Sequence, residues 1–302
     1  NIDQTIKFLV HKMRKIPLEQ GSEAWLNWRK SLLTATDAAM LMGRSPYCTP
    51  FKGWQRKIGD APEQVVTSAM LRGQDDEPRA RAMFIKQYGI HMTPCCIESE
   101  LYNYLGASLD GISDCGRYIL EIKSQPIERV KAEGIPEFHL DQMQEQLLCT
   151  DNIAEMCFYC TIWGDEIYVL EVYPDTKWKE NFIPQAKEFW KLCVFKEPPA
   201  LTNKDYKEMN DNATWNSFAT EYAKLAIQIK ELEDIKDRYK EELIKLSGGD
   251  SCMGAGIKLM KKFIKGRIDY KEACDVLNVR DDQLEQFRKK GSESWAITLD
   301  SK

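Results

Sequence analysis

Two short runs hold the residues whose types and spacing could do chemistry: Ser108-Leu109-Asp110-Gly111 and Leu120-Glu121-Ile122-Lys123-Ser124. Glu121 and Lys123 are two residues apart, so in a strand both side chains point to the same face. The turn signal Asp114-Cys115-Gly116 between the runs predicts a hairpin that returns Glu121 close to Asp110. One face of the hairpin would therefore carry two carboxylates and one ammonium group.

This set suits the hydrolysis of a phosphodiester. Carboxylates are hard oxygen ligands of the kind that Mg²⁺ or Mn²⁺ prefers, and such a metal activates water and neutralises charge on the phosphate. We expect Asp110 and Glu121 to bind the metal together with the carbonyl of Ile122, and Lys123 to orient water or stabilise the pentavalent phosphorus. A plainer interpretation is a surface hairpin with a Glu–Lys ion pair, which is common and weakly stabilising. The short motif alone leaves both interpretations open.

The elements that must position these residues alternate along the chain. Apolar, β-prone runs predict strands over 95–99, 105–109, 118–123, 154–163 and 166–173. Apolar spacing of three and four predicts helices from Ser22, over 73–89 with Pro78 in the first turn, over 136–149 and over 178–195. The pattern favours an α/β fold with a mixed central sheet flanked by helices.

Composition changes after Pro199, which divides the chain into a core over 1–200 and a C-terminal extension over 201–302. Tyr222, Leu225, Ile229 and their successors keep heptad spacing to Leu246, with Lys236 as the one polar interruption. This predicts a long helix that packs on the core or on another subunit. A small α+β appendage follows, with apolar strands expected near 257–260 and 295–299.

Bulk properties are those of a globular protein, since 43% of the 302 residues are hydrophobic and 29% are charged. No apolar run approaches the roughly 20 residues that span a bilayer, and no secretory signal is visible. The ten cysteines are therefore expected to be reduced thiols in a cytoplasmic protein. The net charge of -5 argues against DNA binding, although a basic channel can coexist with acidic outer faces.

Four blocks in order resemble the PD-(D/E)xK nuclease superfamily, and more narrowly the lambda exonuclease and YqaJ-type viral recombinase family. The blocks are Gly21–Trp25 with Trp28-Arg29 and Thr34–Asp37, then Gly73 with Glu77-Pro78 and Ala80-Arg81, then Asp110-Gly111 with Glu121-Ile122-Lys123, and finally Gln142-Met143-Gln144. The order makes the match more specific than any single block. Leu109 stands where the family motif has proline, a residue that takes no part in the chemistry.

The resemblance implies a role for each matching residue. Asp110, Glu121 and the Ile122 carbonyl would hold one Mg²⁺ or Mn²⁺, and Glu77 would contact a second. Lys123 would be the catalytic lysine, and Gln142 would position the water or Lys123. Arg29 and Thr36 would hold a 5′-phosphate, for which a planar guanidinium is well suited. Met70 lies where a relative uses an apolar wedge to split the terminal base pair, and His139 would contact DNA.

The function implied is a metal-dependent 5′-to-3′ exonuclease that degrades one strand of linear double-stranded DNA. It would leave 3′ single-stranded tails for phage-type recombination. Its partners would be DNA ends, a single-strand annealing protein and further copies of itself in a ring, for which a trimer is one arrangement. Two alternatives are a restriction-like or structure-specific endonuclease and a non-catalytic DNA-binding recombination scaffold.

Several other features have plain structural explanations. His139, Gln142 and Gln146 share one helix face, which without the resemblance reads as a solvated surface. Trp25 and Trp28 have the spacing of core residues, although either could stack on bases. Cys157 and Cys160 have the spacing of a metal-binding pair, as in nucleases with an iron–sulfur cluster. They fall inside an expected strand, where free cysteines serve as small buried hydrophobes.

Overall fold

The computed structural model describes residues 13–61, 67–277, 279, 281–284, 287, 289 and 296–297. Contacts divide the chain into two compact units, Asn1–Lys207 and Glu208–Lys302. The first unit carries every predicted site residue. In the described part of the chain, no helix is both long enough and apolar enough to cross a bilayer.

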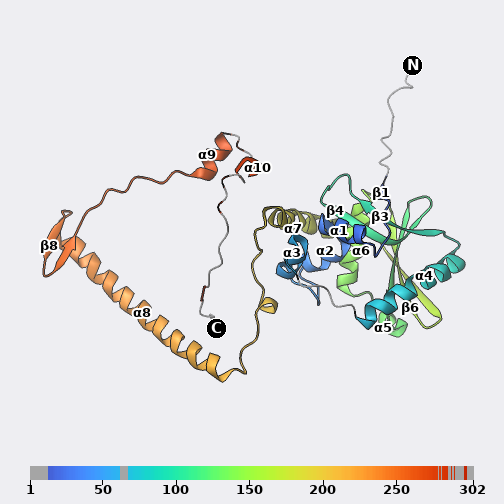
Figure 1. Ribbon diagram of the computed structural model, residues 1–302, viewed down its shortest axis with the longest axis horizontal. Helices are drawn as coiled ribbons and strands as arrows, with labels where there is room; N and C mark the ends of the chain where they lie inside the picture. Colours follow the sequence, from blue (N-terminus) through green and yellow to red (C-terminus); the bar gives the residue numbers. More distant parts are fainter. Residues whose placement is uncertain are drawn as a thin grey trace, which may run out of the picture. The chain divides into compact units, whose positions relative to one another are not determined.

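A mixed sheet of seven described strands forms the centre of the first unit (Figure 1). The strands are β1 (Arg14–Ile16), β2 (Leu33–Thr34), β3 (Met92–Glu98), β4 (Leu105–Ser113), β5 (Tyr118–Ser124), β6 (Met156–Trp163) and β7 (Glu166–Val172). Their order is β1-β3-β4-β5-β6-β7, with β2 beside β4. The β5–β6 and β2–β4 pairs are parallel, and the others are antiparallel. All five predicted strands are therefore present.

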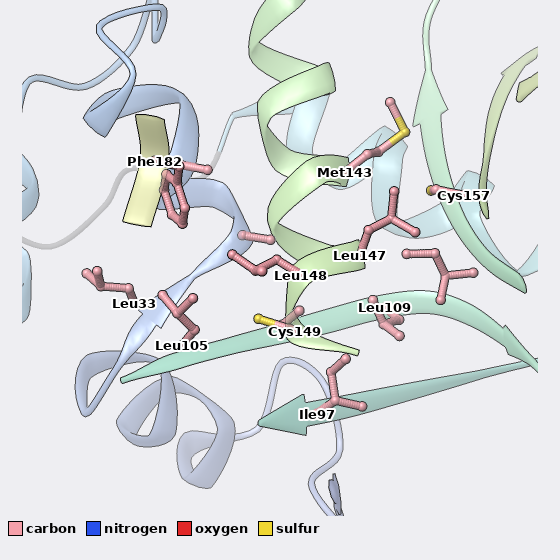
Figure 2. Close-up of a cluster of buried hydrophobic side chains, with 14 of the residues drawn as sticks. Leu33, Ile97, Leu105, Leu109, Met143, Leu147, Leu148, Cys149, Cys157 and Phe182 are labelled. Atoms are coloured by element: carbon pink, nitrogen blue, oxygen red, sulfur yellow. The ribbon is translucent and has the colours of Figure 1, made fainter. Parts of the chain in front are cut away.

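Helices cover both faces of this sheet. They are α1 (Glu23–Lys30), α2 (Ala35–Leu41), α3 (Pro50–Ile58), α4 (Ser68–Tyr88), α5 (Ile127–Glu133), α6 (Glu137–Cys149) and α7 (Thr176–Phe195), followed by the short 3-10 helix η1 (Asn203–Asp205). One buried cluster joins α2, α3, α6 and α7 to the sheet, and Figure 2 shows its centre between α6 and β4. A second cluster joins α4 to the sheet. Ile119 belongs to the first and its neighbour Leu120 to the second, so the clusters lie on opposite faces.

The start of α4 differs from the sequence expectation. The helix begins at Ser68 rather than near Gly73, because the Thr67 hydroxyl caps it by accepting from the Met70 N–H at 3.3 Å. Pro78 is consequently an interior residue of a 21-residue helix and not part of its first turn. The expectation was wrong because Gly73 was read as a boundary, whereas glycine is tolerated inside a helix at a cost of about 1 kcal/mol.

The second unit contains α8 (Ala213–Leu246), β8 (Cys252–Gly254), β9 (Ile257–Leu259), α9 (Tyr270–Val276) and α10 (Asp281–Leu284). The helix α8 is the predicted heptad helix, and β8 pairs with β9 as an antiparallel two-stranded sheet. Most of the strand expected near 295–299 lies outside the described residues.

Candidate active site

The hairpin of β4 and β5 brings the two predicted acids together. Its register pairs Gly111 with Leu120, which places Asp110 directly opposite Glu121. The Ile122 backbone N–H donates to Oδ2 of Asp110 at 2.7 Å. The Asp110 carboxylate is thus held across the two strands at the point where the acids meet.

A β-bulge sets the direction of Asp110. The register of β3 against β4 shifts between Thr93 and Cys95, so that Asp110 and Gly111 both lie opposite the single residue Pro94. Proline has no N–H to donate to the strand ladder, and a bulge re-aims the side chains of the strand that carries it. A Cβ atom at Gly111 would lie 2.9 Å from a neighbouring side-chain carbon, so the bulge needs glycine there.

Two glutamines from α6 hold the Glu121 carboxylate, which is only 2% exposed. Gln142 Nε2 donates to Oε1 at 2.7 Å, and Gln146 Nε2 donates to Oε2 at 2.5 Å. Lys123 Nζ lies 2.5 Å from Oε1 of Glu121 and donates to the side-chain oxygen of Gln142 at 3.1 Å. Gln142 therefore links the acid to the lysine, and both are fixed by one helix.

Glu77 approaches the same place from α4. Its carboxylate accepts from the Arg81 guanidinium, while Arg81 Nε donates to the backbone oxygen of Asp110 at 2.5 Å. Arg81 consequently links the Glu77 carboxylate to the β-bulge that carries Asp110.

Electrostatics show that the acids crowd one another. Burial, together with repulsion from Glu121 and Glu77, raises the pKa of Asp110 well above its usual range. Burial also raises the pKa of Glu77, and Glu121 adds to the effect while Arg81 opposes it. Burial alone would lower the pKa of Lys123, but attraction by Glu121 and Asp110 raises it overall. Lys123 is therefore a permanent ammonium group at neutral pH.

The donor set fits a divalent cation. Burial and repulsion among the acids raise the pKa of Asp110 and of Glu77, and a hard cation would relieve that repulsion by binding the carboxylate oxygens. Within the part of the chain that the structure describes, no three acidic, histidine or cysteine side chains already form a metal-binding group. Glu121 is bound by Lys123 and Gln146, and Glu77 by Arg81, so a metal would exchange with these partners.

Arg29 and Thr36 meet beside the acids. Arg29 donates to the Thr36 hydroxyl at 2.8 Å, and its guanidinium lies 4.6 Å from the centre of the Trp25 ring. The Lys57 ammonium fixes the end of α1 by donating to the backbone oxygens of Arg29 and Leu32 at 2.8 and 2.9 Å. Burial lowers the pKa of Arg29, yet arginine remains charged at any physiological pH.

A single cavity of about 190 Å³ joins these groups. Its lining includes three acids, two cations and one glutamine among the predicted site residues: Glu77, Asp110, Glu121, Arg29, Lys123 and Gln142, with Thr36 and Ile122 beside them. Met70 and His139 do not line it. Met70 is 40% exposed in the first turn of α4, and His139 donates or accepts at 2.8 Å with the Tyr159 hydroxyl.

Comparison with known proteins gives a match over the part of the chain that forms this site. Residues 24–152 match the YqaJ-like viral recombinase domain. The chain is similar to this family over that range. The matched range contains all the residues that line the cavity except Gln20, so the resemblance seen in the sequence is confirmed. YqaJ of Bacillus subtilis (strain 168) is 24% identical over an alignment of 284 positions, which covers 85% of this chain and 88% of that protein.

Solved structures share the fold of more than half of the chain. The alkaline exonuclease LHK-Exo from Laribacter hongkongensis is 23% identical with a TM-score of 0.50, over 58% of this chain and 94% of that chain. The same enzyme in complex with dAMP matches with 22% identity and the same TM-score and coverage. The predicted α/β fold with a mixed central sheet flanked by helices is thus confirmed.

Two cavity features of the YqaJ-like domain were missed from the sequence. Trp25 was expected in the core, but it lines the cavity and donates to the Ser108 hydroxyl at 2.8 Å. Gln146 was assigned to a polar helix face, but it is fully buried against Glu121. The signals were present, since Trp25 lies four residues before Arg29 and Gln146 four after Gln142.

The cysteine pair of β6 lies on opposite faces of the sheet. Cys157 packs in the first buried cluster and Cys160 in the second. Burial raises the pKa of both thiols, that of Cys160 to about 12. Two thiols that face opposite ways cannot bind one metal cluster, so they are core residues.

Proposed function

We propose that this protein is a metal-dependent exonuclease that digests one strand of linear double-stranded DNA from its 5′ end. It leaves 3′ single-stranded tails for recombination by single-strand annealing. One observation carries the proposal: the hydrogen-bonded pair Arg29 and Thr36, whose groups suit a phosphate, shares a cavity of about 190 Å³ with an acid–lysine cluster. An enzyme that cuts next to a strand end needs both groups within one nucleotide's reach.

The terminal 5′-phosphate would bind at Arg29 and Thr36. The guanidinium can present two parallel N–H groups to phosphate oxygens, and the ring of Trp25 holds it in place. Thr36 offers its hydroxyl beside the guanidinium. Strand polarity would follow from this contact, because a 5′-phosphate bound here leaves the first phosphodiester to reach the acids.

Hydrolysis would take place between Asp110, Glu121 and Lys123. Mg²⁺ or Mn²⁺, with two ions per site, would supply an activated water and charge neutralisation when held by Asp110, Glu121, the Ile122 carbonyl and Glu77. Lys123 acts by charge, since its raised pKa keeps it protonated beside the developing negative charge on phosphorus. Gln142 keeps Lys123 in position through its side-chain oxygen.

Lys123→Ala tests the chemistry. We expect loss of strand degradation with DNA binding largely kept, as measured by mononucleotide release and by a binding assay on the same duplex. Undiminished degradation would remove the mechanism. Omitting Mg²⁺ and Mn²⁺ should stop wild-type degradation, and activity that persists in chelator would refute the metal requirement.

The substrate form separates this function from its alternatives. A 5′-labelled linear duplex should be degraded, while closed circular DNA should stay intact. A restriction-like or structure-specific endonuclease would cut the circle, and a non-catalytic scaffold would leave both untouched. Arg29 and Thr36 favour the exonuclease, because cutting within a duplex has no use for a terminal phosphate pocket.

Arg29→Ala tests the phosphate pocket. We expect the rate on 5′-phosphorylated ends to fall more than the rate on 5′-hydroxyl ends, because only the former loses a charged contact. An equal loss on both ends would reject the assignment.

For partners, we propose a ring-shaped homo-oligomer around DNA, with a trimer as the simplest ring, and a single-strand annealing protein that receives the 3′ tail. The mass of the protein in solution tests the ring. Co-purification with a single-strand annealing protein tests the second partner.

A further inference from the structure

A second and larger cavity adjoins the catalytic one. It has a volume of about 510 Å³ and shares Ile122 and Lys123 with the catalytic cavity. The volume is within the range of about 300–1,000 Å³ that is typical of small-molecule sites. The loop before α3, α4, α5 and α6 all contribute to its wall, together with the end of β5.

Aromatic rings form one side of this cavity. Tyr47 is 80% exposed, and its ring meets Phe138 edge-on with the centres 5.9 Å apart. Phe138 in turn lies 4.3 Å from the His139 ring. An exposed tyrosine ring supported from the edge presents its flat face, and every nucleobase can stack on such a face.

The charge of the cavity is opposite to that of the catalytic one. Among the described residues that line it, Lys123 and Arg129 are cations, and none is a carboxylate. Arg129 uses Nε for Glu133 at 2.9 Å, and its side chain is 64% exposed. Burial and these two cations lower the pKa of His139 to about 3, so its imidazole is neutral. The cavity therefore combines stacking surface with positive charge.

We propose that this cavity binds an unpaired nucleotide of the substrate strand, with its base stacked on Tyr47 and its phosphate directed to Arg129. The inference rests on the proposed function. With the terminal phosphate at Arg29 and the scissile phosphate at Lys123, the bound nucleotide is the one on the 3′ side of the cut. It stays with the DNA and becomes the next end.

A nucleotide that stacks on tyrosine cannot remain stacked in the duplex. The site therefore opens the second base pair before the first bond is cut. It also keeps hold of the strand after the mononucleotide leaves, which favours several cuts in one binding event.

The experiment uses the full chain with Tyr47→Ala, Tyr47→Phe and the control Tyr173→Ala. Tyr173 is a tyrosine of similar exposure, at 60%, outside the lining of either cavity. The substrate is a 5′-phosphorylated duplex with 2-aminopurine as the second nucleotide, or far inside the duplex as a reference. Fluorescence is recorded in chelator, and steady-state rates are recorded with Mg²⁺.

We expect wild type to change the 2-aminopurine signal at the second nucleotide only. Tyr47→Ala should abolish that change and raise KM about tenfold, the usual effect of losing one stacked base. Tyr47→Phe should restore both, and Tyr173→Ala should match wild type. Arg129→Ala should raise KM and leave kcat nearly unchanged.

The inference is overturned if Tyr47→Ala matches wild type, or if Tyr47→Phe is as impaired as Tyr47→Ala, since the hydroxyl would then matter and not the ring. Either result leaves the proposed function intact, provided that Lys123→Ala still abolishes degradation. Failure of the proposed function would show instead as full activity in Lys123→Ala.

Discussion

Glu145 is a buried acid that should limit the stability of the protein at neutral pH. It lies on α6, as do Gln142 and Gln146, and is fully buried. Oε1 accepts from the Cys149 thiol at 3.4 Å, and within the described residues Oε2 has no hydrogen-bond partner. Burial raises its pKa well above the ordinary value of 4.5, and Asp37 adds to this, while Lys57 and Arg29 oppose it.

The sign of the pH effect follows from this direction. An acid with a raised pKa in the folded state holds its proton more tightly there than in the unfolded chain. Its stabilising contribution is complete below pH 4.5 and is lost as the pH rises towards the folded pKa. Each pH unit between the unfolded pKa and the folded pKa costs about 1.4 kcal/mol, so the protein loses stability progressively across that interval.

Glu145→Gln keeps the shape of the protonated acid and cannot ionise. We expect equal melting temperatures for variant and wild type near pH 4.5, and a melting temperature of the variant that rises relative to wild type by roughly 3–6 °C per pH unit above that. Circular dichroism melts across this range measure the difference. Glu188→Gln, an exposed acid paired with Lys191 on α7, is the matched control and should show no such trend. A variant that becomes less stable than wild type as the pH rises would refute the reasoning, because Glu145 would then be an anion held by Arg29 and Lys57.

Three further predictions concern the site and α8. Gln146→Met should lower kcat by about tenfold or more, because a hydrogen bond to a buried charge contributes roughly 1.5–3 kcal/mol. Steady-state rates should show an unchanged KM for this variant, and the exposed control Gln185→Met should match wild type. Gly111→Ala should lower the free energy of unfolding by about 1–3 kcal/mol, because the added Cβ would lie 2.9 Å from Met92 Cβ. The control Gly73→Ala adds its Cβ in open space and should not destabilise the protein. Denaturant unfolding curves that show the same stability for both variants would contradict this. Leu232 on α8 is 64% exposed. Leu232→Asp should keep the helical circular dichroism signal and reduce the mass of the oligomer measured by light scattering. An unchanged mass would exclude α8 from assembly.

The acids and the lysine could be predicted from sequence because strand alternation and hairpin pairing are local rules. Glu121 and Lys123 share a face by the period of a strand, and the turn at Asp114–Gly116 sets the partner of Asp110. Both need only residues within the same hairpin. The five strands and the long helix α8 were predictable for the same reason, since each carries its own apolar period.

Features set by distant contacts could not be predicted. The bulge at Asp110 depends on Pro94 in β3, which the sequence does not pair with β4 until the sheet is known. Gln146 becomes a buried partner of Glu121 only because α6 packs on that face of the sheet. The helix α4 begins several residues earlier than expected because Thr67 caps it. That cap lies before Gly73, which looked like the start of the helix in the sequence.

The net charge of -5 argued against DNA binding, and the geometry shows why this total says little. Acids gather in the catalytic cavity, where a cation would compensate them, while the adjoining cavity is lined by Lys123 and Arg129 without a carboxylate among its described residues. The field that a phosphate meets comes mainly from groups within about 10 Å, because salt screens the rest. In the proposed binding mode, a strand that passes from one cavity to the other would meet positive charge on both sides of the scissile phosphate, from Arg29 and from Arg129. Raising the salt concentration should weaken binding of a DNA end with a slope set by these few contacts, and Arg129→Ala should lower that slope by about one.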